Sequence, residues 1–287
     1  MRLGRASLPM PMLFDIPVLV VVPAFNESLR IEQVLRTMPT FVDHVILVDD
    51  ASTDGTREVA HCASDPRVTV LRNAENHGVG KAITNGYKFA ASVELNPRAA
   101  VIVMAGDAQM HPDDMPSLVR PIAAGDADYV KGNRFVWPGV TSIMPFPRWA
   151  AGHVLSWLTS LAVGKTVHDS QCGYTAIARE AIVKLPLHKL WPRYGYPNDL
   201  LGMASAHGLR IAERPVRPVY AGEASGLRAH HVAVIFGLLG RIVWRRLVSR
   251  FHGLAVLERE RPLHNRGNMP KHVVDIEQRS ERGAIDA

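Results

Sequence analysis

Cysteines and long apolar runs are scarce in this sequence. Their scarcity argues against disulfide-rich, cysteine-ligated metal and membrane-spanning proteins. Only two cysteines, Cys62 and Cys172, occur among 287 residues, and they lie far apart. They form neither a disulfide framework nor a metal-ligand spacing, and they suit a reducing cytosol. The longest apolar stretch, residues 232–240, has nine residues, whereas a transmembrane helix needs about 20. We therefore expect no membrane-spanning helix.

Two common nucleotide-binding motifs and a secretory signal are also missing. A dinucleotide-binding domain has G-x-G-x-x-G after its first strand, but this sequence has P-A-F-N-E there. No G-x-x-x-x-G-K-[ST] motif occurs, which argues against a P-loop. Residues 1–15 lack the continuous apolar run of a secretory signal. We interpret them as an N-terminal extension and expect a cytoplasmic protein.

Positive charge is concentrated near the C-terminus. The formal net charge is +6, and residues 241–287 contain ten Lys or Arg against six Asp or Glu, a net +4. The chain before them is only mildly basic, which argues against a nucleic-acid partner bound across the domain. With 47% apolar and 21% charged residues, the composition is that of an ordinary globular protein with a sizeable core.

Short apolar, β-branched runs alternate with helix-like segments through the first half of the chain. Strands at roughly thirty-residue intervals predict an α/β fold, in which a mostly parallel sheet carries helices on both faces. The second half is less regular and ends in a predicted helix over residues 231–258 and a flexible tail over 259–287. The strands are expected at residues 18–22, 45–48, 68–71 and 100–104, with a short one beginning at 129.

Polar residues follow three of the expected strands at their carboxyl ends. They are Asn26 and Glu27, Asp49 and Asp50, and the Gly106–Asp107 pair. Ligands of open α/β sheets bind beyond these strand ends. Carboxylate oxygens suit Mg²⁺ or Mn²⁺, which commonly bind one or two carboxylates together with substrate phosphates. The pattern predicts a diphosphate site that uses a divalent metal.

Seven motifs in order resemble one known family. VVPAFNE, VDDASTDGT, NHGVGKA and AGDAQMHP follow the order of family 2 glycosyltransferases, which are inverting enzymes of the Rossmann-like GT-A fold. VKGNR, DSQCGYTAI and IAERPVRPVY resemble the polyprenyl-phosphate sugar transferases of the dolichyl-phosphate-mannose-synthase kind. The resemblance covers residues 16–230 and implies a GT-A domain over that range.

The resemblance assigns donor-binding roles. It places Pro23, Phe25 and Glu27 against the nucleoside and Asp50 on the base or ribose. From the residues alone, Asp50 is equally a loop or helix-capping carboxylate. In the glycine-bearing loop, Gly78 and Lys81 would pass the nucleotide, and the alternative for Lys81 is a solvated surface lysine.

The metal site is assigned in the same way. Asp107 and Gln109 match the family's metal motif, but Ala105 stands where the family carries the first aspartate of Asp-x-Asp. A metal held by one firm carboxylate would take much of its coordination from the donor diphosphate.

Four further residues are candidates for phosphate and acceptor chemistry. Arg134 in GNR and Arg228 in EASGLR would bind phosphate, and the alternative for Arg134 is a surface salt bridge. Asp199 lies at a predicted helix start, where it is either the general base for a hydroxyl acceptor or a carboxylate favoured by the helix dipole. Asp169 marks the acceptor side in the family, or orders its own loop.

The C-terminal helix is predicted to be amphipathic. Trp244, Leu247, Val248 and Phe251 form an apolar stripe at i, i+3, i+4 and i+7. Such a helix suits the surface of an anionic membrane, and the alternative is a helix packed on its own domain with its arginines in solvent. The arginines on the remaining arc are Arg241, Arg245, Arg246 and Arg250.

The combined prediction is a metal-dependent transferase that moves a sugar from a UDP- or GDP-sugar to a polyprenyl phosphate. We expect it to lie peripherally at the inner face of the cytoplasmic membrane. Two alternatives stay open at this point. One is a soluble transferase with a saccharide or small-molecule hydroxyl acceptor, and the other is a non-catalytic nucleotide-sugar binder, which Ala105 motivates.

Overall fold

The computed structural model describes residues 15–63, 65–93, 99–219 and 229–259. The predicted N-terminal extension, except for Asp15, the tail after Arg259 and the candidate phosphate ligand Arg228 lie outside these residues. The chain divides after Ser249 into two units. The first holds the entire sheet, and the described part of the second is the end of the last helix.

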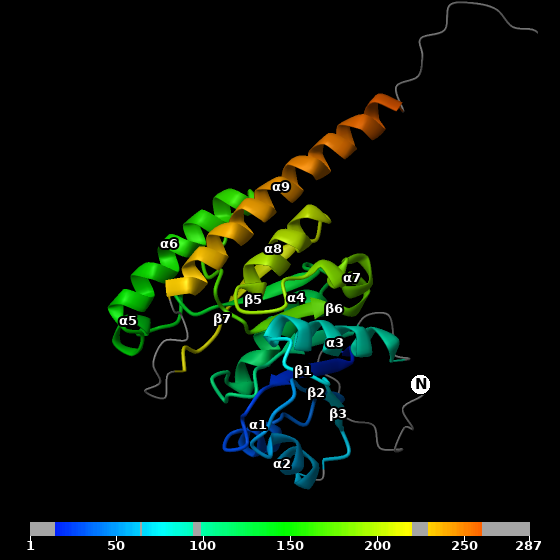
Figure 1. The fold of residues 1–287 in the computed structure, drawn as a ribbon, viewed down its shortest axis with the longest axis vertical. Coiled ribbons are helices and arrows are strands. Elements are labelled where there is room, and N and C mark those ends of the chain that lie inside the picture. Colours follow the sequence, from blue (N-terminus) through cyan, green and yellow to red (C-terminus); the bar gives the residue numbers. More distant parts are fainter. Residues whose placement is uncertain (1–14, 64, 94–98, 220–228, 260–287) are drawn as a thin grey trace, which may run out of the picture. The chain divides into compact units, whose positions relative to one another are not determined.

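The first unit is built on a seven-stranded sheet with strand order β3-β2-β1-β4-β6-β5-β7 (Figure 1). Only β6 runs antiparallel to its neighbours β4 and β5, so the predicted mostly parallel α/β sheet is confirmed. The strands are β1 Val18–Ala24, β2 His44–Asp49, β3 Val68–Arg72, β4 Ala100–Val103, β5 Tyr129–Asn133, β6 Thr175–Ala178 and β7 Ile211–Pro215.

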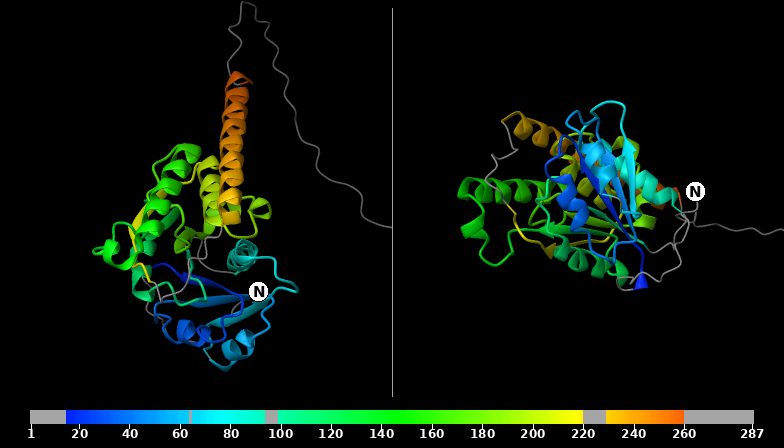
Figure 2. Two further views of the ribbon diagram at one scale, coloured as in Figure 1. Left: turned by 60° about the vertical axis from the view of Figure 1, so that its left-hand side comes forward. Right: turned by 90° about the horizontal axis from the view of Figure 1, so that it is seen from below.

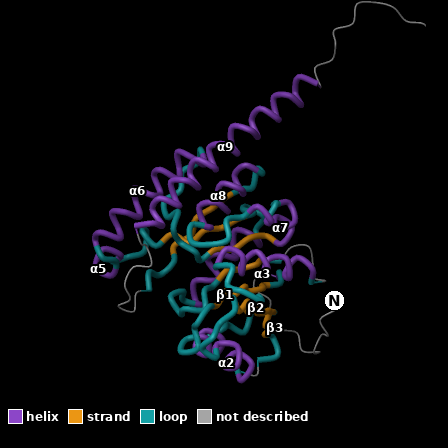
Figure 3. The backbone as a smooth tube through the Cα atoms, viewed as in Figure 1, coloured by secondary structure: helices purple, strands orange, loops and turns teal. Residues whose placement is uncertain are grey.

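Helices surround this sheet, as the tube drawing in Figure 3 shows. The chain crosses the sheet from β1 to β3 and then returns to β4 on the other side of β1. Because crossovers between parallel strands are right-handed, this reversal places α3 on the opposite face from α1 and α2. The α-helices are α1 Ile31–Arg36, α2 Thr56–Cys62, α3 Val79–Ser92, α4 Met115–Ala123, α5 Val140–Ile143, α6 Phe146–Val163, α7 Arg179–Lys184, α8 Tyr196–Ala206 and α9 Ala229–Arg259, with short 3-10 turns η2 Pro112–Asp114 and η3 Leu187–Lys189.

The central strands are buried along their whole length. Every residue of β1, β2 and β4 is buried, which explains why these strands are continuous apolar runs without alternation. Helix α3 lies so close to β1 that a Cβ added at Gly86 would come within 2.3 Å of Val21 Cγ1. The views in Figures 1 and 2 agree on the position of α3 beside β1 and β2.

The last helix packs on the domain, but not through Trp244 and Leu247 of the predicted apolar stripe. Ile235, Leu238, Leu239 and Ile242 are buried, whereas Trp244 is 68% exposed. The packed-helix alternative placed the arginines in solvent, and that detail is wrong, because Arg245 and Arg246 bond to the domain. Among the described residues, no helix is both long and apolar enough to cross a bilayer.

We expect Gly86→Ala to lower the free energy of unfolding by about 1–2 kcal/mol. Overpacking costs about 1–3 kcal/mol, and alanine recovers up to about 1 kcal/mol in helix propensity. The matched control is Gly240→Ala in α9, where an added Cβ meets nothing within 4 Å. That variant should gain about 0.5–1 kcal/mol. Urea denaturation measures both, and equal effects would contradict the close approach of α3 to β1.

Candidate active site

The candidate site begins where β1, β2 and β4 end at one edge of the sheet. Backbone hydrogen bonds continue past the strands and join the three ends: Asp50 N–H donates to the Ala24 carbonyl at 2.9 Å, and Gly106 N–H donates to the Pro23 carbonyl at 3.0 Å. Phe25 follows β1 and is exposed. The structure therefore brings the predicted nucleoside residues and the Asp107 loop to the same edge.

The loops after β1 and β2 are fastened to each other. Glu27 N–H donates to Thr56 Oγ1 at 2.8 Å, and Ser28 N–H donates to Asp54 Oδ2 at 3.0 Å. Desolvation raises the pKa of Asp54, but hydrogen bonds from Thr56 and Ser28 outweigh it and bring the pKa to about 2. Glu27 is thereby held at the site by its own backbone.

Asp50 is buried, and its carboxylate organises the glycine-bearing loop. Oδ1 accepts hydrogen bonds from Asn73 Nδ2 at 2.6 Å and from His77 N–H at 3.1 Å, and Oδ2 accepts one from Gly78 N–H at 2.7 Å. These contacts match the alternative interpretation of Asp50 as a loop carboxylate. Its assignment to the base or ribose stays a prediction.

The glycines of this loop face protein backbone. A Cβ at Gly80 would lie 2.2 Å from the Trp191 carbonyl oxygen, and one at Gly78 would lie 2.7 Å from that of Pro192. Lys81 N–H donates to the same Pro192 carbonyl at 3.0 Å. The absence of side chains is therefore required for packing against residues 191–193, a segment that the sequence patterns did not connect with the loop.

The loop after β4 carries the predicted metal ligands. Asp107 Oδ1 accepts a hydrogen bond from Gln109 N–H at 3.0 Å, and Ala108 between them has a positive φ of 59°. The part of the chain that the structure describes contains no group of three or more His, Cys, Asp or Glu side chains that could hold a metal. A carboxylate and a side-chain amide are oxygen donors of the kind that suits Mg²⁺ or Mn²⁺ shared with substrate phosphates, and the metal role of Asp107 and Gln109 stays a prediction.

Arg134 is paired with the fully buried carboxylate of Asp169. Its Nε donates to Asp169 Oδ2 at 2.8 Å and its Nη2 donates to Oδ1 at 2.9 Å, a forked arrangement. Burial raises the pKa of Asp169, but the charge and hydrogen bonds of Arg134 outweigh it and hold the pKa below its usual value. The pair is thus more than the surface salt bridge considered from sequence.

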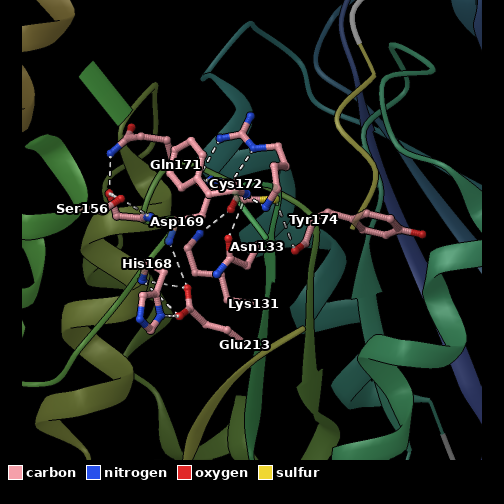
Figure 4. A network of polar contacts seen from close by, with 12 residues as sticks. Lys131, Asn133, Ser156, His168, Asp169, Gln171, Cys172, Tyr174 and Glu213 are labelled. Atoms are coloured by element: carbon pink, nitrogen blue, oxygen red, sulfur yellow. Dashed lines mark hydrogen bonds and ion pairs between the residues drawn. The ribbon is translucent and has the colours of Figure 1, made fainter. Parts of the chain in front are cut away.

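The surroundings of Asp169 extend this network. Lys131 is fully buried, its ammonium donates to the Cys172 carbonyl, and burial lowers its pKa. Glu213 on β7 accepts hydrogen bonds from the N–H groups of His168 and Asp169, each at 3.0 Å. Figure 4 shows Lys131, Asp169 and Glu213 side by side. Sequence patterns did not single out Lys131 or Glu213. The two residues become neighbours only because β5 and β7 lie side by side in the sheet.

Comparison with known proteins identifies the family. The family model described as Glycosyl transferase family 2 matches residues 19–185. The chain belongs to this family. It is 30% identical to an uncharacterized protein of Methanocaldococcus jannaschii over 80% of this chain and 92% of that one. It is 29% identical to the UDP-N-acetylglucosamine–dolichyl-phosphate N-acetylglucosaminyltransferase of Methanococcus voltae, over 79% of this chain and 95% of that one.

Two further proteins place the chain among glycosyltransferases of known sequence and fold. The polyprenol monophosphomannose synthase of Mycolicibacterium smegmatis is 29% identical over 69% of this chain and 76% of its own length. The crystal structure of glucosyl-3-phosphoglycerate synthase from Mycobacterium tuberculosis, in complex with Mn²⁺, UDP and glucosyl-3-phosphoglycerate, superposes with a TM-score of 0.57. It is 23% identical and covers 86% of both chains. This likeness confirms the predicted GT-A fold.

Asp199, the candidate base of this glycosyltransferase, has no exposed surface. It lies in the first turn of α8. Its Oδ2 accepts a hydrogen bond from Trp191 N–H at 2.8 Å, and its Oδ1 accepts one from Arg245 Nη1 at 2.6 Å. This environment matches the helix-start alternative and leaves a role as a base without geometric support.

We expect Asp169→Asn to destabilise the protein by about 3 kcal/mol at pH 7, because loss of one partner of a buried ion pair strands the other. The pKa of Asp169 is depressed in the folded state, so its stabilisation is present above the unfolded pKa of about 4. It is lost as the pH falls through the folded pKa. The gap between wild type and variant in urea denaturation should narrow below about pH 4.

The control for this experiment is Asp128→Asn. Asp128 pairs with Arg210, whose side chain is 57% exposed, at 2.7 Å. A pair at the surface contributes about 0–1 kcal/mol. Equal losses in the Asp128 and Asp169 variants at pH 7 would show that burial adds nothing to the Arg134 pair.

Proposed function

We propose that this glycosyltransferase moves a sugar from a metal-bound nucleoside diphosphate to a polyprenyl phosphate at a membrane surface. An oxygen of the acceptor phosphate bonds to the anomeric carbon while the bond from that carbon to the donor diphosphate breaks. The observation that carries the proposal is the pair of apolar helix faces described below. The names of two relatives, a dolichyl-phosphate and a polyprenol transferase, support it.

The donor is placed at the edge formed by β1, β2 and β4. Pro23, Phe25 and Glu27 would line the nucleoside, with Asp50 on the base or ribose and Gly78 and Lys81 beside the phosphates. The support is their common location and the UDP in the Mycobacterium tuberculosis structure.

The metal is assigned to Asp107 and Gln109. When bound, Mg²⁺ or Mn²⁺ stabilises the negative charge of the departing diphosphate as a Lewis acid. Asp107 supplies the carboxylate, and its hydrogen bond from Gln109 N–H holds the loop in shape. Arg134, fixed by Asp169, presents a guanidinium for phosphate at the end of β5.

The environment of Asp199 favours a phosphate acceptor. A hydroxyl acceptor needs a general base to take its proton, whereas an ionised phosphate needs none. Both oxygens of Asp199 are occupied by Trp191 and Arg245 in the interior of the protein. The residue considered as the base for a hydroxyl acceptor therefore has another task.

Two apolar helix faces support a membrane surface as the place of reaction. Helices α6 and α9 touch where Arg246 Nη1 donates to the Leu161 carbonyl at 3.1 Å. Both expose large apolar side chains at helical spacing, and neither contains Asp or Glu before Glu258. Apolar helix faces without acidic residues, beside the arginines of α9, suit an anionic lipid interface. The exposed residues are Val154, Trp157 and Leu161 on α6, and Phe236, Val243, Trp244 and Leu247 on α9.

Asp107→Ala should weaken binding of UDP or GDP in the presence of Mn²⁺ by at least about tenfold, which is about 1.4 kcal/mol. It should also remove the difference between titrations with and without Mn²⁺, because the metal loses its carboxylate. Isothermal titration calorimetry measures both. Asp126→Ala, an exposed carboxylate after α4, is the control. Retention of the full Mn²⁺ effect in Asp107→Ala would refute the metal assignment.

Trp157→Gln combined with Trp244→Gln should reduce sedimentation with phosphatidylglycerol vesicles by about tenfold, since two interfacial side chains are lost. Binding should also weaken with salt. The control is Val183→Gln on α7, where the valine is 74% exposed. Wild-type protein that stays in the supernatant at low salt would overturn the membrane assignment and favour a soluble acceptor.

A further inference from the structure

Residues 189–193, which run from the last residue of η3 toward α8, lie between the glycine-bearing loop and helix α9. On one side, the Pro192 carbonyl accepts the hydrogen bond from Lys81 N–H at 3.0 Å. Arg193 Nη2 also donates to the Asn76 carbonyl at 3.4 Å. The segment therefore forms one wall of the loop that begins α3.

This wall cannot move without moving the loop. Gly78 and Gly80 lie against the backbone of the segment with no room for a side chain. A Cβ added at Gly80 would lie 2.2 Å from the Trp191 carbonyl oxygen. Close-packed interiors transmit such displacements because they leave no space to absorb them. On the opposite side the loop is held by Asp50, whose carboxylate accepts hydrogen bonds from the N–H groups of His77 and Gly78.

Two arginines of α9 hold the other side of the segment. Arg245 donates through Nη1 to Asp199 Oδ1 at 2.6 Å and through Nη2 to the Lys189 carbonyl at 3.1 Å. Arg241 Nη2 donates to the same carbonyl at 2.6 Å, and its Nη1 lies 3.6 Å from Asp199 Oδ2. Asp199 Oδ2 in turn accepts a hydrogen bond from Trp191 N–H at 2.8 Å.

These contacts form an unbroken path from α9, through Asp199 and residues 189–193, to Gly78 and Lys81. We infer that Asp199 and Arg245 are positioning residues for the donor-binding loop. They link the conformation of this loop to the position of α9 on the domain. The inference rests on the proposed function in taking this loop as part of the donor site. It gives the carboxylate of Asp199 a task in the reaction that requires no contact with substrate.

The link is also reciprocal if α9 docks on lipid. Any displacement of α9 that strengthens the Arg245 contacts favours the loop conformation that binds the donor, and donor binding favours the same position of α9. The helix that exposes Trp244 to its surroundings is the helix that carries Arg245. The contact of α9 with a lipid surface and the conformation of the donor-binding loop are thus connected through Arg245 and Asp199.

The test replaces Arg245 with lysine, which keeps the charge but cannot donate to Asp199 and the Lys189 carbonyl with the same planar fork. Arg246→Lys is the matched control, since Arg246 is the next residue on α9 and bonds to the Leu161 carbonyl of α6. Two quantities are measured. They are hydrogen exchange at the amides of Gly78 and Lys81, and the affinity for UDP and for GDP, each with Mn²⁺.

For Arg245→Lys we expect hydrogen exchange at these amides to be at least about tenfold faster. We also expect its affinity for whichever nucleotide binds the wild type to fall by a similar factor. Arg246→Lys should change neither. If Arg245→Lys does not fold, the double variant Asp199→Asn with Arg245→Gln removes both charges together, so that neither is stranded in the interior. It should show the same rise in exchange.

Unchanged exchange in a folded Arg245 variant overturns the inference, and so does faster exchange with unchanged nucleotide affinity. Failure of wild type to bind either nucleotide is a different result. It overturns the proposed function and, with it, the donor part of the inference.

Discussion

The candidate site depends on the position of β1 between β2 and β4. Parallel register pairs Ala24 with Asp49 and Val21 with Val103, so the three strands end within a few residues of one another. The loops that follow are then close enough for backbone hydrogen bonds from Asp50 and Gly106 to the end of β1. Because the strand order reverses at this point, the loops diverge to opposite faces and a ligand can bind between them.

Two buried ion pairs organise the less regular second half of the chain. Asp169 with Arg134 and Asp199 with Arg245 each combine a carboxylate without exposed surface and an arginine fork. Buried ion pairs are weak evidence for stability in themselves, because desolvation offsets part of their attraction. Their directional hydrogen bonds instead determine where the guanidinium of Arg134 and the segment beside the glycine-bearing loop lie.

Helix α9 has two faces with different surroundings. Ile235, Leu238 and Ile242 bury one face against the domain, and Arg241 and Arg245 extend that contact. Trp244 and its apolar neighbours remain exposed, which is costly unless another surface covers them. A helix that is fixed by arginines on one face can present apolar side chains on another without losing its place.

The sequence by itself determined the family, the first five strands along the chain and the set of polar residues at the carboxyl ends of three of them. These follow from local signals: continuous apolar runs for buried strands, and motifs whose members lie within ten residues of one another. The arrangement of α9 did not follow, because helical periodicity separates apolar from charged residues without saying which group meets the domain.

Only the tertiary structure decided the partners of the buried charges. Asp199 and Arg245 are 46 residues apart, and Arg134 and Asp169 are 35 apart. No periodicity connects them, since their pairing depends on how whole elements pack. The same holds for Gly78, which the family resemblance placed beside the nucleotide, and for Gly80. The structure shows that they accommodate the backbone of residues 191–193, because a chain segment distant in sequence becomes a neighbour only when the sheet and its helices have assembled.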